Sequence, residues 1–205
     1  MMVAMRFIPL SLGLSLLALL TCSFAGRAAV PIAPSMPVSD QRVAQTSAPD
    51  LIDRANQRVK QGDNQGAIQL LNQALKLKPK YSLAYYNRGN AKLRLRDYPG
   101  AISDYNQAIR VNVDWGTVDP AYAYINRGVA RTLSGDRQGA IADYTQALKV
   151  NPQNADAYYN RGLDYRDMGD NQRAVADFKK AATLYQQQGN TASYESAIKR
   201  INELQ

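Results

Sequence analysis

The sequence contains no histidine and a single cysteine, so it nearly lacks the two side chains that most often carry nucleophilic and metal-assisted catalysis. It also lacks a glycine-rich phosphate-binding loop and any cluster of carboxylates at metal-ligand spacing. The Asp, Lys and Tyr residues do not converge on one site. We therefore expect a protein that is not an enzyme and that holds no cofactor or metal. An enzyme or a glycan-binding protein is the least favoured class.

The charge is basic but dispersed. The 25 Lys and Arg residues outnumber the 17 Asp and Glu residues, which gives a formal charge of +8 and a pI of about 9.6. Along the predicted groove Asp53, Asp156 and Asp167 offset the basic residues Lys60, Arg94 and Arg166, which does not predict an electrostatic track for nucleic acid. We expect no nucleic-acid partner, whereas a basic outer surface favours acidic partners or an anionic membrane.

Residues 1–25 have the three parts of a secretory signal peptide. Arg6 provides the positive start, and the apolar run from Phe7 to Leu20 is too short to span a bilayer comfortably. Ser23-Phe24-Ala25 then places small residues around a cleavable bond. This pattern predicts export, to a periplasm or a thylakoid lumen.

Cys22, the only cysteine, lies inside this leader and has more than one interpretation. Leu19-Leu20-Thr21 precedes it as in a bacterial lipoprotein site, which makes Cys22 a candidate lipidation site, although Thr21 fits that pattern poorly. Cleavage after Ala25 would instead discard Cys22, and an uncleaved leader would act as a membrane anchor. In each case the mature protein has no disulfide.

Residues 26–47 are rich in Ala, Pro, Ser, Gln and Val and have no helical or strand period. Pro31, Pro34 and Pro37 favour an extended backbone. We interpret this segment as a flexible linker.

The remainder of the chain repeats at intervals of about 34 residues. Tyr85-Tyr86-Asn87-Arg88-Gly89, followed by Gly100-Ala101-Ile102-Ser103-Asp104-Tyr105, returns in altered form from Tyr124 and from Tyr158. A degenerate copy comes first. The units are 48–81, 82–115, 121–154 and 155–188, with residues 116–120 inserted between the second and third.

Each unit contains two helices in which small residues face large ones. Glycines at 89, 128 and 162 recur inside the first helix, although each costs about 1 kcal/mol relative to alanine. Their recurrence predicts a close approach to Tyr105, Tyr144 and Phe178. Gly-Asp pairs mark the turns between the helices, and Arg96-Asp97 departs from them, so we expect a less favourable turn there.

The spacing of Tyr, Gly, Ala, aromatic, Ala and Pro resembles the tetratricopeptide repeat (TPR). The recurring motifs Asn-Arg-Gly and Gly-Ala-Ile-x-Asp-Tyr are similar to those of exported TPR proteins of cyanobacterial type. The resemblance covers 48–188, about two-thirds of the chain, with Ala55 in place of the first glycine. It implies an all-α fold, a right-handed superhelical solenoid of four helix-turn-helix units plus a C-terminal capping helix at 190–204. In that helix Thr191 is the expected N-cap, and Tyr194, Ile198 and Ile201 share one face.

In TPR proteins the first helices line a concave groove that binds protein segments. Carried over by position, the expected peptide-binding residues are Tyr86, Asn87, Asn90, Arg94, Tyr122, Asn126, Tyr159 and Asn160. Three asparagines at one repeat position (87, 126 and 160) could pair with an extended backbone, because an amide both donates and accepts. Alternatively these asparagines bond neighbouring helices, and the tyrosines serve packing between repeats.

Two further features need separate explanations. Arg88, Arg127 and Arg161 each precede an aspartate by sixteen residues, which favours Arg–Asp pairs between the two helices of a unit. Trp115, the only tryptophan, directly precedes the insertion 116–120. That insertion is either a tolerated loop extension or a partner contact anchored by Trp115.

We expect a non-catalytic exported scaffold that binds a protein or peptide segment, and that assists assembly of an envelope or photosynthetic-membrane complex. The alternative is a lipid-anchored envelope protein that organises membrane or cell-wall complexes. The partner's identity and the oligomeric state do not follow from the sequence.

Overall fold

The computed structural model describes residues 47–205, and these residues form nine α-helices and no β-strand. The predicted signal peptide (1–25), Cys22 and all but the last residue of the predicted linker (26–47) lie outside the described part. The helices are α1 (Ala48–Lys60), α2 (Asn64–Leu77), α3 (Ser82–Arg94), α4 (Tyr98–Val111), α5 (Ala121–Leu133), α6 (Arg137–Val150), α7 (Ala155–Asp167), α8 (Asn171–Gln187) and α9 (Thr191–Asn202).

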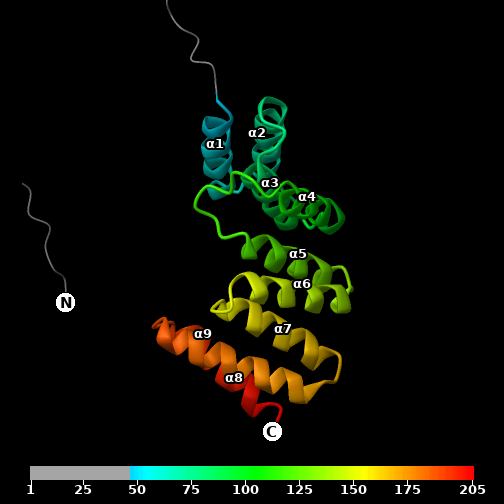
Figure 1. Ribbon diagram of the computed structural model, residues 1–205, viewed down its shortest axis with the longest axis vertical. Helices are drawn as coiled ribbons and strands as arrows, with labels where there is room; N and C mark the ends of the chain where they lie inside the picture. The colour runs from blue at the N-terminus through cyan, green and yellow to red at the C-terminus, as the bar shows by residue number, and fades with distance from the viewer. Residues whose placement is uncertain (1–46) are drawn as a thin grey trace, which may run out of the picture. The chain divides into compact units, whose positions relative to one another are not determined.

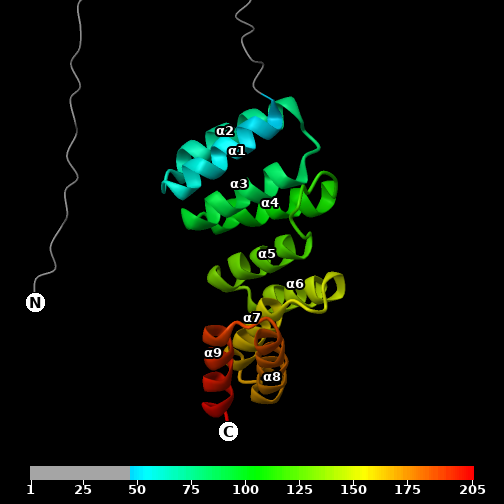
Figure 2. The same cartoon turned by 90° about the vertical axis from the view of Figure 1, so that its left-hand side faces the viewer.

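The helices stack in chain order as four pairs followed by α9 (Figures 1 and 2). Each helix packs mainly against its neighbours in sequence, and α1, α3, α5 and α7 also contact one another in succession. This arrangement confirms the all-α solenoid. None of the nine helices in the described region is both long and apolar enough to cross a membrane.

The turn inside each pair has the predicted chemistry. Four aspartates cap the second helices, and each accepts a hydrogen bond of 2.8 to 3.0 Å from the backbone N–H three residues later; they are Asp63, Asp97, Asp136 and Asp170. The residue before each cap has a positive φ, at Gly62 (81°), Gly135 (93°), Gly169 (82°) and Arg96 (61°). Arg96 therefore occupies a left-handed conformation that suits glycine, as its departure from the Gly-Asp pattern predicted.

The glycines inside the first helices allow the predicted close approach. A Cβ atom built on Gly128 would lie 2.7 Å from the Tyr144 ring, and one on Gly89 would lie equally close to Tyr105. For Gly162 the corresponding distance to Phe178 is 2.9 Å. Such distances are shorter than van der Waals contact, so these aromatic rings fill the space that the missing side chains leave.

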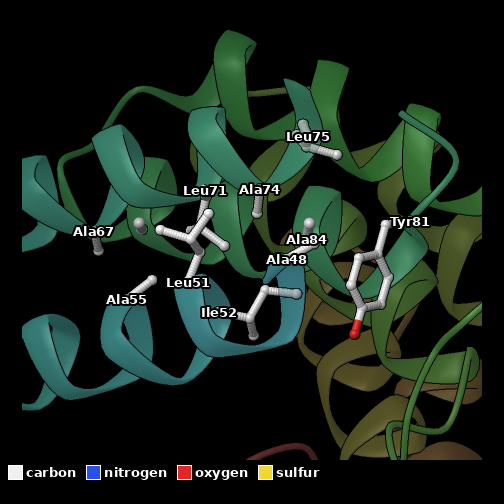
Figure 3. Packing of buried hydrophobic residues seen from close by; sticks show 11 residues of the cluster. Ala48, Leu51, Ile52, Ala55, Ala67, Leu71, Ala74, Leu75, Tyr81 and Ala84 are labelled. Carbon is white, nitrogen blue, oxygen red and sulfur yellow. The ribbon is translucent and has the colours of Figure 1, made fainter. Parts of the chain in front are cut away.

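The first unit has different residues at the two positions of this close contact. It has Ala55 at the glycine position and Leu71 at the aromatic position, and both are fully buried. Leu51 and Leu71 project toward each other between α1 and α2 (Figure 3). The smaller leucine leaves room for the alanine methyl group, which explains why this copy departs from the others.

The helix α9 covers the last pair, as predicted. It buries Ala197 and Ile201, while Tyr194 and Ile198 are half-buried against the residues beneath them. The prediction of Thr191 as N-cap is wrong by one residue. Asn190 has the non-helical backbone angles and accepts the hydrogen bond from the Ser193 N–H, so Thr191 is the first helical residue.

Candidate functional site

The candidate site is a cavity of about 360 Å³ on the face formed by α1, α3 and α5, hereafter the central cavity. It is lined by Asn56, Val59, Tyr86, Asn87, Asn90, Leu93, Arg94 and Asn126. The structure therefore brings together Tyr86, Asn87, Asn90, Arg94 and Asn126 of the expected peptide-binding residues. Tyr122, Tyr159 and Asn160 do not line this cavity.

Asparagine amides link the helices that form the central cavity. The Asn87 Nδ2 donates to Oδ1 of Asn56 at 3.1 Å, which joins α3 to α1. The Asn126 Nδ2 donates to Oδ1 of Asn90 at 2.8 Å and to the Tyr86 hydroxyl at 3.2 Å, which joins α5 to α3. Two of the three asparagines therefore do bond neighbouring helices, while the Oδ1 atom of each accepts no hydrogen bond within residues 47–205.

This linkage stops at the last unit. The acceptors Asn56 and Asn90 occupy one repeat position, and Val129 stands there in the third unit. Valine has no side-chain acceptor, so Asn160 finds no equivalent partner, and no hydrogen bond to its side chain forms within the described region. Neither the Nδ2 donor nor the Oδ1 acceptor of Asn160 is therefore engaged within residues 47–205.

Two tyrosine hydroxyls, those of Tyr86 and Tyr105, contact the amides of the central cavity. The Tyr105 hydroxyl, from α4, donates to Oδ1 of Asn90 at 2.8 Å. Burial raises the pKa of the Tyr86 and Tyr105 hydroxyls above the ordinary value, so both remain protonated at neutral pH. Asn90 thus receives two hydrogen bonds and is held in one orientation, whereas Asn87 is held by one.

The remaining predicted tyrosines have different environments. The Tyr159 ring packs against Phe178 and Tyr185, with centroid distances of 5.5 and 6.4 Å. Tyr159 also lies in the same apolar cluster as Ile198 of α9, which indicates that it packs between helices. Tyr122 is 40% exposed at the start of α5 and is available for contact.

Trp115 lies beside the central cavity, and the sequence did not reveal this. Its ring stands edge-on to the Tyr86 ring at a centroid distance of 6.3 Å. Its indole N–H donates to Oδ1 of Asn112 at 3.1 Å, so the polar edge of the ring is already satisfied. Trp115 therefore contacts the cavity through Tyr86, which lines it, and is not itself one of the lining residues.

The segment that carries Trp115 is anchored at several points. The backbone N–H of Ser82 donates to the Val113 carbonyl at 3.0 Å. Asp114 forms an ion pair of 2.9 Å with Lys78. Beyond the tryptophan, the Asp119 carboxylate accepts from the Asn151 side chain at 2.6 Å. These contacts position the inserted residues rather than leave them as a loose loop.

The predicted Arg–Asp pairs are confirmed. Arg127 donates to both carboxylate oxygens of Asp143, at 2.9 and 2.5 Å, and to Asn106 of the preceding unit at 2.6 Å. Equivalent pairs join Arg88 to Asp104 and Arg161 to Asp177. Each guanidinium therefore connects two helices of its own unit with the unit before it, which is a structural role.

Charges on the face of the odd-numbered helices are distributed unevenly. In the last unit Asp167 is paired with Arg166 at 2.7 Å and with Arg137 at 3.1 Å. Arg94, on the wall of the central cavity, is exposed and has no carboxylate within 4.0 Å among residues 47–205. Lys60, at the same repeat position in the first unit, is likewise exposed and unpaired within that part of the chain.

A buried carboxylate lies near this face in the third and fourth units. Asp164, on α7, is 1% exposed where the equivalent residues are Ala91 and Ala130. Its Oδ2 accepts from the Thr132 hydroxyl at 2.6 Å, and the nearest cation, Nε of Arg137, is 3.8 Å from Oδ1. Burial raises the pKa of the Asp164 carboxyl, since desolvation outweighs these contacts.

Metal binding has no visible basis in this part of the chain. Residues 47–205 contain no group of three or more His, Cys, Asp or Glu side chains that could hold a metal ion. The chemistry that the central cavity offers is hydrogen bonding by amides, contact with aromatic rings, and one unpaired cation.

Solved structures share this architecture. The crystal structure of MamA protein aligns over 78% of this chain and 92% of its own, at 22% identity and a TM-score of 0.59. The second TPR domain of human RPAP3, in complex with the HSP70 peptide SGPTIEEVD, aligns over 57% and 93%, at 27% identity and 0.53. YrrB, described as a TPR protein with an unusual peptide-binding site, aligns over 79% and 88%, at 18% identity and 0.57.

Sequence families agree with the structural comparison. No curated protein matches the chain. The family described as "TPR repeat" matches residues 55–95 and 128–165, and the family described as "Tetratricopeptide repeat" matches 82–114 and 155–190. Together these matches cover more than half of the sequence, and the chain belongs to the tetratricopeptide repeat family.

Proposed function

We propose that the protein is a non-catalytic scaffold that binds an extended segment of another protein in the central cavity. The observation that carries the proposal is the row of asparagine amides, in which the Oδ1 atoms of Asn87 and Asn126 remain available beside Tyr86. These oxygens can accept backbone N–H groups from a peptide of any sequence. Because each amide is held by a bond to a neighbouring helix, little side-chain entropy is lost on binding.

The structural relatives support this class of function. RPAP3 is seen with an HSP70 peptide, and YrrB is described by its peptide-binding site. The 27% identity with the RPAP3 domain makes a peptide ligand a reasonable starting point for this chain. The central cavity of this protein has its own residues, so the ligand need not be the same.

We further propose that the scaffold acts after export, in a periplasm or thylakoid lumen, where it assists assembly of an envelope or photosynthetic-membrane complex. The support is the pattern of residues 1–25. The alternative is a lipid-anchored protein, supported by Cys22 within that leader. Metabolic labelling with a fatty-acid analogue separates the two, because only the lipid-anchored protein would incorporate label and lose it in Cys22→Ser.

The experiment that tests binding is affinity capture from an envelope extract with residues 26–205, followed by mass spectrometry. The protein is compared with Asn87→Ala/Asn126→Ala and with Gln146→Ala, an exposed residue on α6 that makes no side-chain hydrogen bond in the described part of the chain. A partner retained by wild type and Gln146→Ala but lost by the double variant supports the proposal. A partner captured equally by all three proteins would move binding to another surface.

A further inference from the structure

Along α3 an aromatic ring (Tyr86) is followed by two amides (Asn87 and Asn90) and then by a guanidinium (Arg94). Together these groups define the ligand that this face fits. We propose that the protein selects an extended peptide in which an apolar side chain and a carboxylate are three or four residues apart. The apolar side chain would pack on Trp115 and Tyr86, and the carboxylate would pair with Arg94. This inference rests on the proposed function, because it specifies the ligand of the same cavity.

The apolar end is built by the inserted segment. Trp115 stands against Tyr86, and its only polar atom is occupied by Asn112. The Tyr86 hydroxyl oxygen accepts from Asn126, whereas its O–H donates to no acceptor within residues 47–205. The two ring systems offer a hydrocarbon surface on which an apolar side chain can pack, and the Tyr86 O–H can donate to the backbone of the same peptide.

The charged end is provided by Arg94. This residue shares the central cavity with Tyr86, and its guanidinium has no acidic partner within residues 47–205. Lys60 adds a second unpaired cation at the equivalent position of the preceding unit. The exposed acid on α1, Asp53, lies seven residues before Lys60, about two helical turns away. A carboxylate therefore complements this end, and an ammonium group is repelled by it.

The spacing follows from helix geometry. Tyr86 and Arg94 are eight residues apart on α3, which corresponds to about 12 Å along the axis. An extended chain advances about 3.3 Å per residue, so it covers this length in three or four residues. The amides of Asn87, Asn90 and Asn126 lie between the two ends, where they face the backbone of such a peptide.

The test is a selection from a displayed library of random linear peptides, performed in parallel with residues 26–205 and with the Arg94→Glu variant. We expect wild type to enrich Asp or Glu three or four positions from an apolar residue. Arg94→Glu should enrich Lys or Arg at the same spacing. Because Arg94 is exposed and unpaired, its substitution is not expected to affect folding, which circular dichroism checks.

A selected peptide is then synthesised and titrated by intrinsic fluorescence, since Trp115 is the only tryptophan in the chain. We expect a change in Trp115 emission on binding, and an affinity that falls by about tenfold or more in Arg94→Glu. Replacing the peptide's acid by lysine should restore binding to that variant. Trp115→Phe, which keeps an aromatic ring, should retain more affinity than Trp115→Ala.

The outcomes separate this inference from the proposed function. Peptides that are selected and that depend on Asn87 and Asn126, but that show no acid and no response to Arg94→Glu, would overturn the inference and leave the proposed function intact. Peptides that bind equally well to the asparagine double variant would place binding elsewhere and overturn both. Enrichment of no peptide would also overturn the inference.

Discussion

The side-chain amide of Asn126 on α5 donates a hydrogen bond of 2.8 Å to Oδ1 of Asn90 on α3. For the equivalent Asn160 on α7, the repeat position of that acceptor is occupied by Val129, and no such bond forms within residues 47–205. Residues at one repeat position therefore have unequal structural roles. A loss of binding in an asparagine variant must be separated from a loss of stability, and Asn160 provides the comparison.

The first prediction concerns this difference. Asn126→Ala should lower the free energy of unfolding by about 1 kcal/mol, because it removes hydrogen bonds to Asn90 and Tyr86. Asn160→Ala should leave stability within about 0.5 kcal/mol of wild type. Urea denaturation followed by circular dichroism measures both. Equal losses in the two variants would mean that the bond between Asn126 and Asn90 contributes nothing measurable.

The second prediction concerns the Arg–Asp pairs. Arg127→Ala should destabilise the protein by about 3 kcal/mol, because the Asp143 side chain is only 3% exposed and would keep a single cation, Arg131. The matched control is Arg54→Ala, since the first unit has Leu70 in the place of the aspartate and Arg54 is exposed. That variant should change stability by less than about 0.5 kcal/mol. A similar cost at both sites would argue that the guanidinium stem, not the ion pair, stabilises the repeat.

These pairs illustrate what the sequence could predict. A spacing of sixteen residues repeated in three units, and broken by Leu70 in the first, was sufficient to place Arg127 against Asp143. Glycine positions and the unusual turn at Arg96 were predicted on the same basis. Repetition makes such inferences reliable, because each copy tests the interpretation of the others.

The third prediction concerns the turn between α3 and α4. Arg96→Gly should stabilise the protein by about 1 kcal/mol, because Arg96 has a φ of 61° and glycine adopts this conformation without a steric penalty. The converse control is Gly135→Ala in the next unit. A Cβ atom there meets no atom within 4 Å, so its expected cost of about 1 kcal/mol arises from the backbone alone. Thermal unfolding compares the two, and a less stable Arg96→Gly would show that another property of arginine compensates.

The fourth prediction concerns the glycine and the ring that it faces. Gly128→Ala should destabilise the protein by about 2 kcal/mol, since the new methyl group would lie 2.7 Å from the Tyr144 ring. Adding Tyr144→Leu should recover part of this loss, because the first unit combines Ala55 with Leu71. A double-mutant cycle measures the coupling, which should be favourable by at least about 0.5 kcal/mol. Additive losses would mean that the ring can move away from the alanine.

Features that occur only once, or that join different repeat positions, were not predictable in this way. The contact of Trp115 with Tyr86 depends on the path of an inserted segment that has no counterpart in the other units. The bonds from Asn87 to Asn56 and from Asn126 to Asn90 occur twice, but each joins two different repeat positions, so a comparison of equivalent residues does not reveal the acceptor. Asp164 replaces an alanine in a single copy, and its burial follows from the stacking of α7 on α5 and α6.

The fifth prediction uses this buried acid. Burial raises the folded-state pKa of Asp164 above its value of about 3.8 in the unfolded chain, so the folded protein binds the proton more tightly. The contribution of Asp164 to the free energy of unfolding must therefore fall as the pH rises from about 3.8 through the raised pKa. The Asp164→Asn variant loses this dependence, because its amide does not titrate, and the amide carbonyl can still accept from Thr132.

Asp164→Asn should accordingly be more stable than wild type at pH 7, and its advantage should be smaller at pH 4. Urea denaturation at the two values measures the difference, and the exposed Asp53→Asn serves as the control, with an expected change within about 0.5 kcal/mol at both. If Asp164→Asn were instead less stable at pH 7, attraction to Arg137 at 3.8 Å would outweigh the cost of burying the charge. The pH dependence would then reverse sign, because the pKa of Asp164 would lie below that of the unfolded chain.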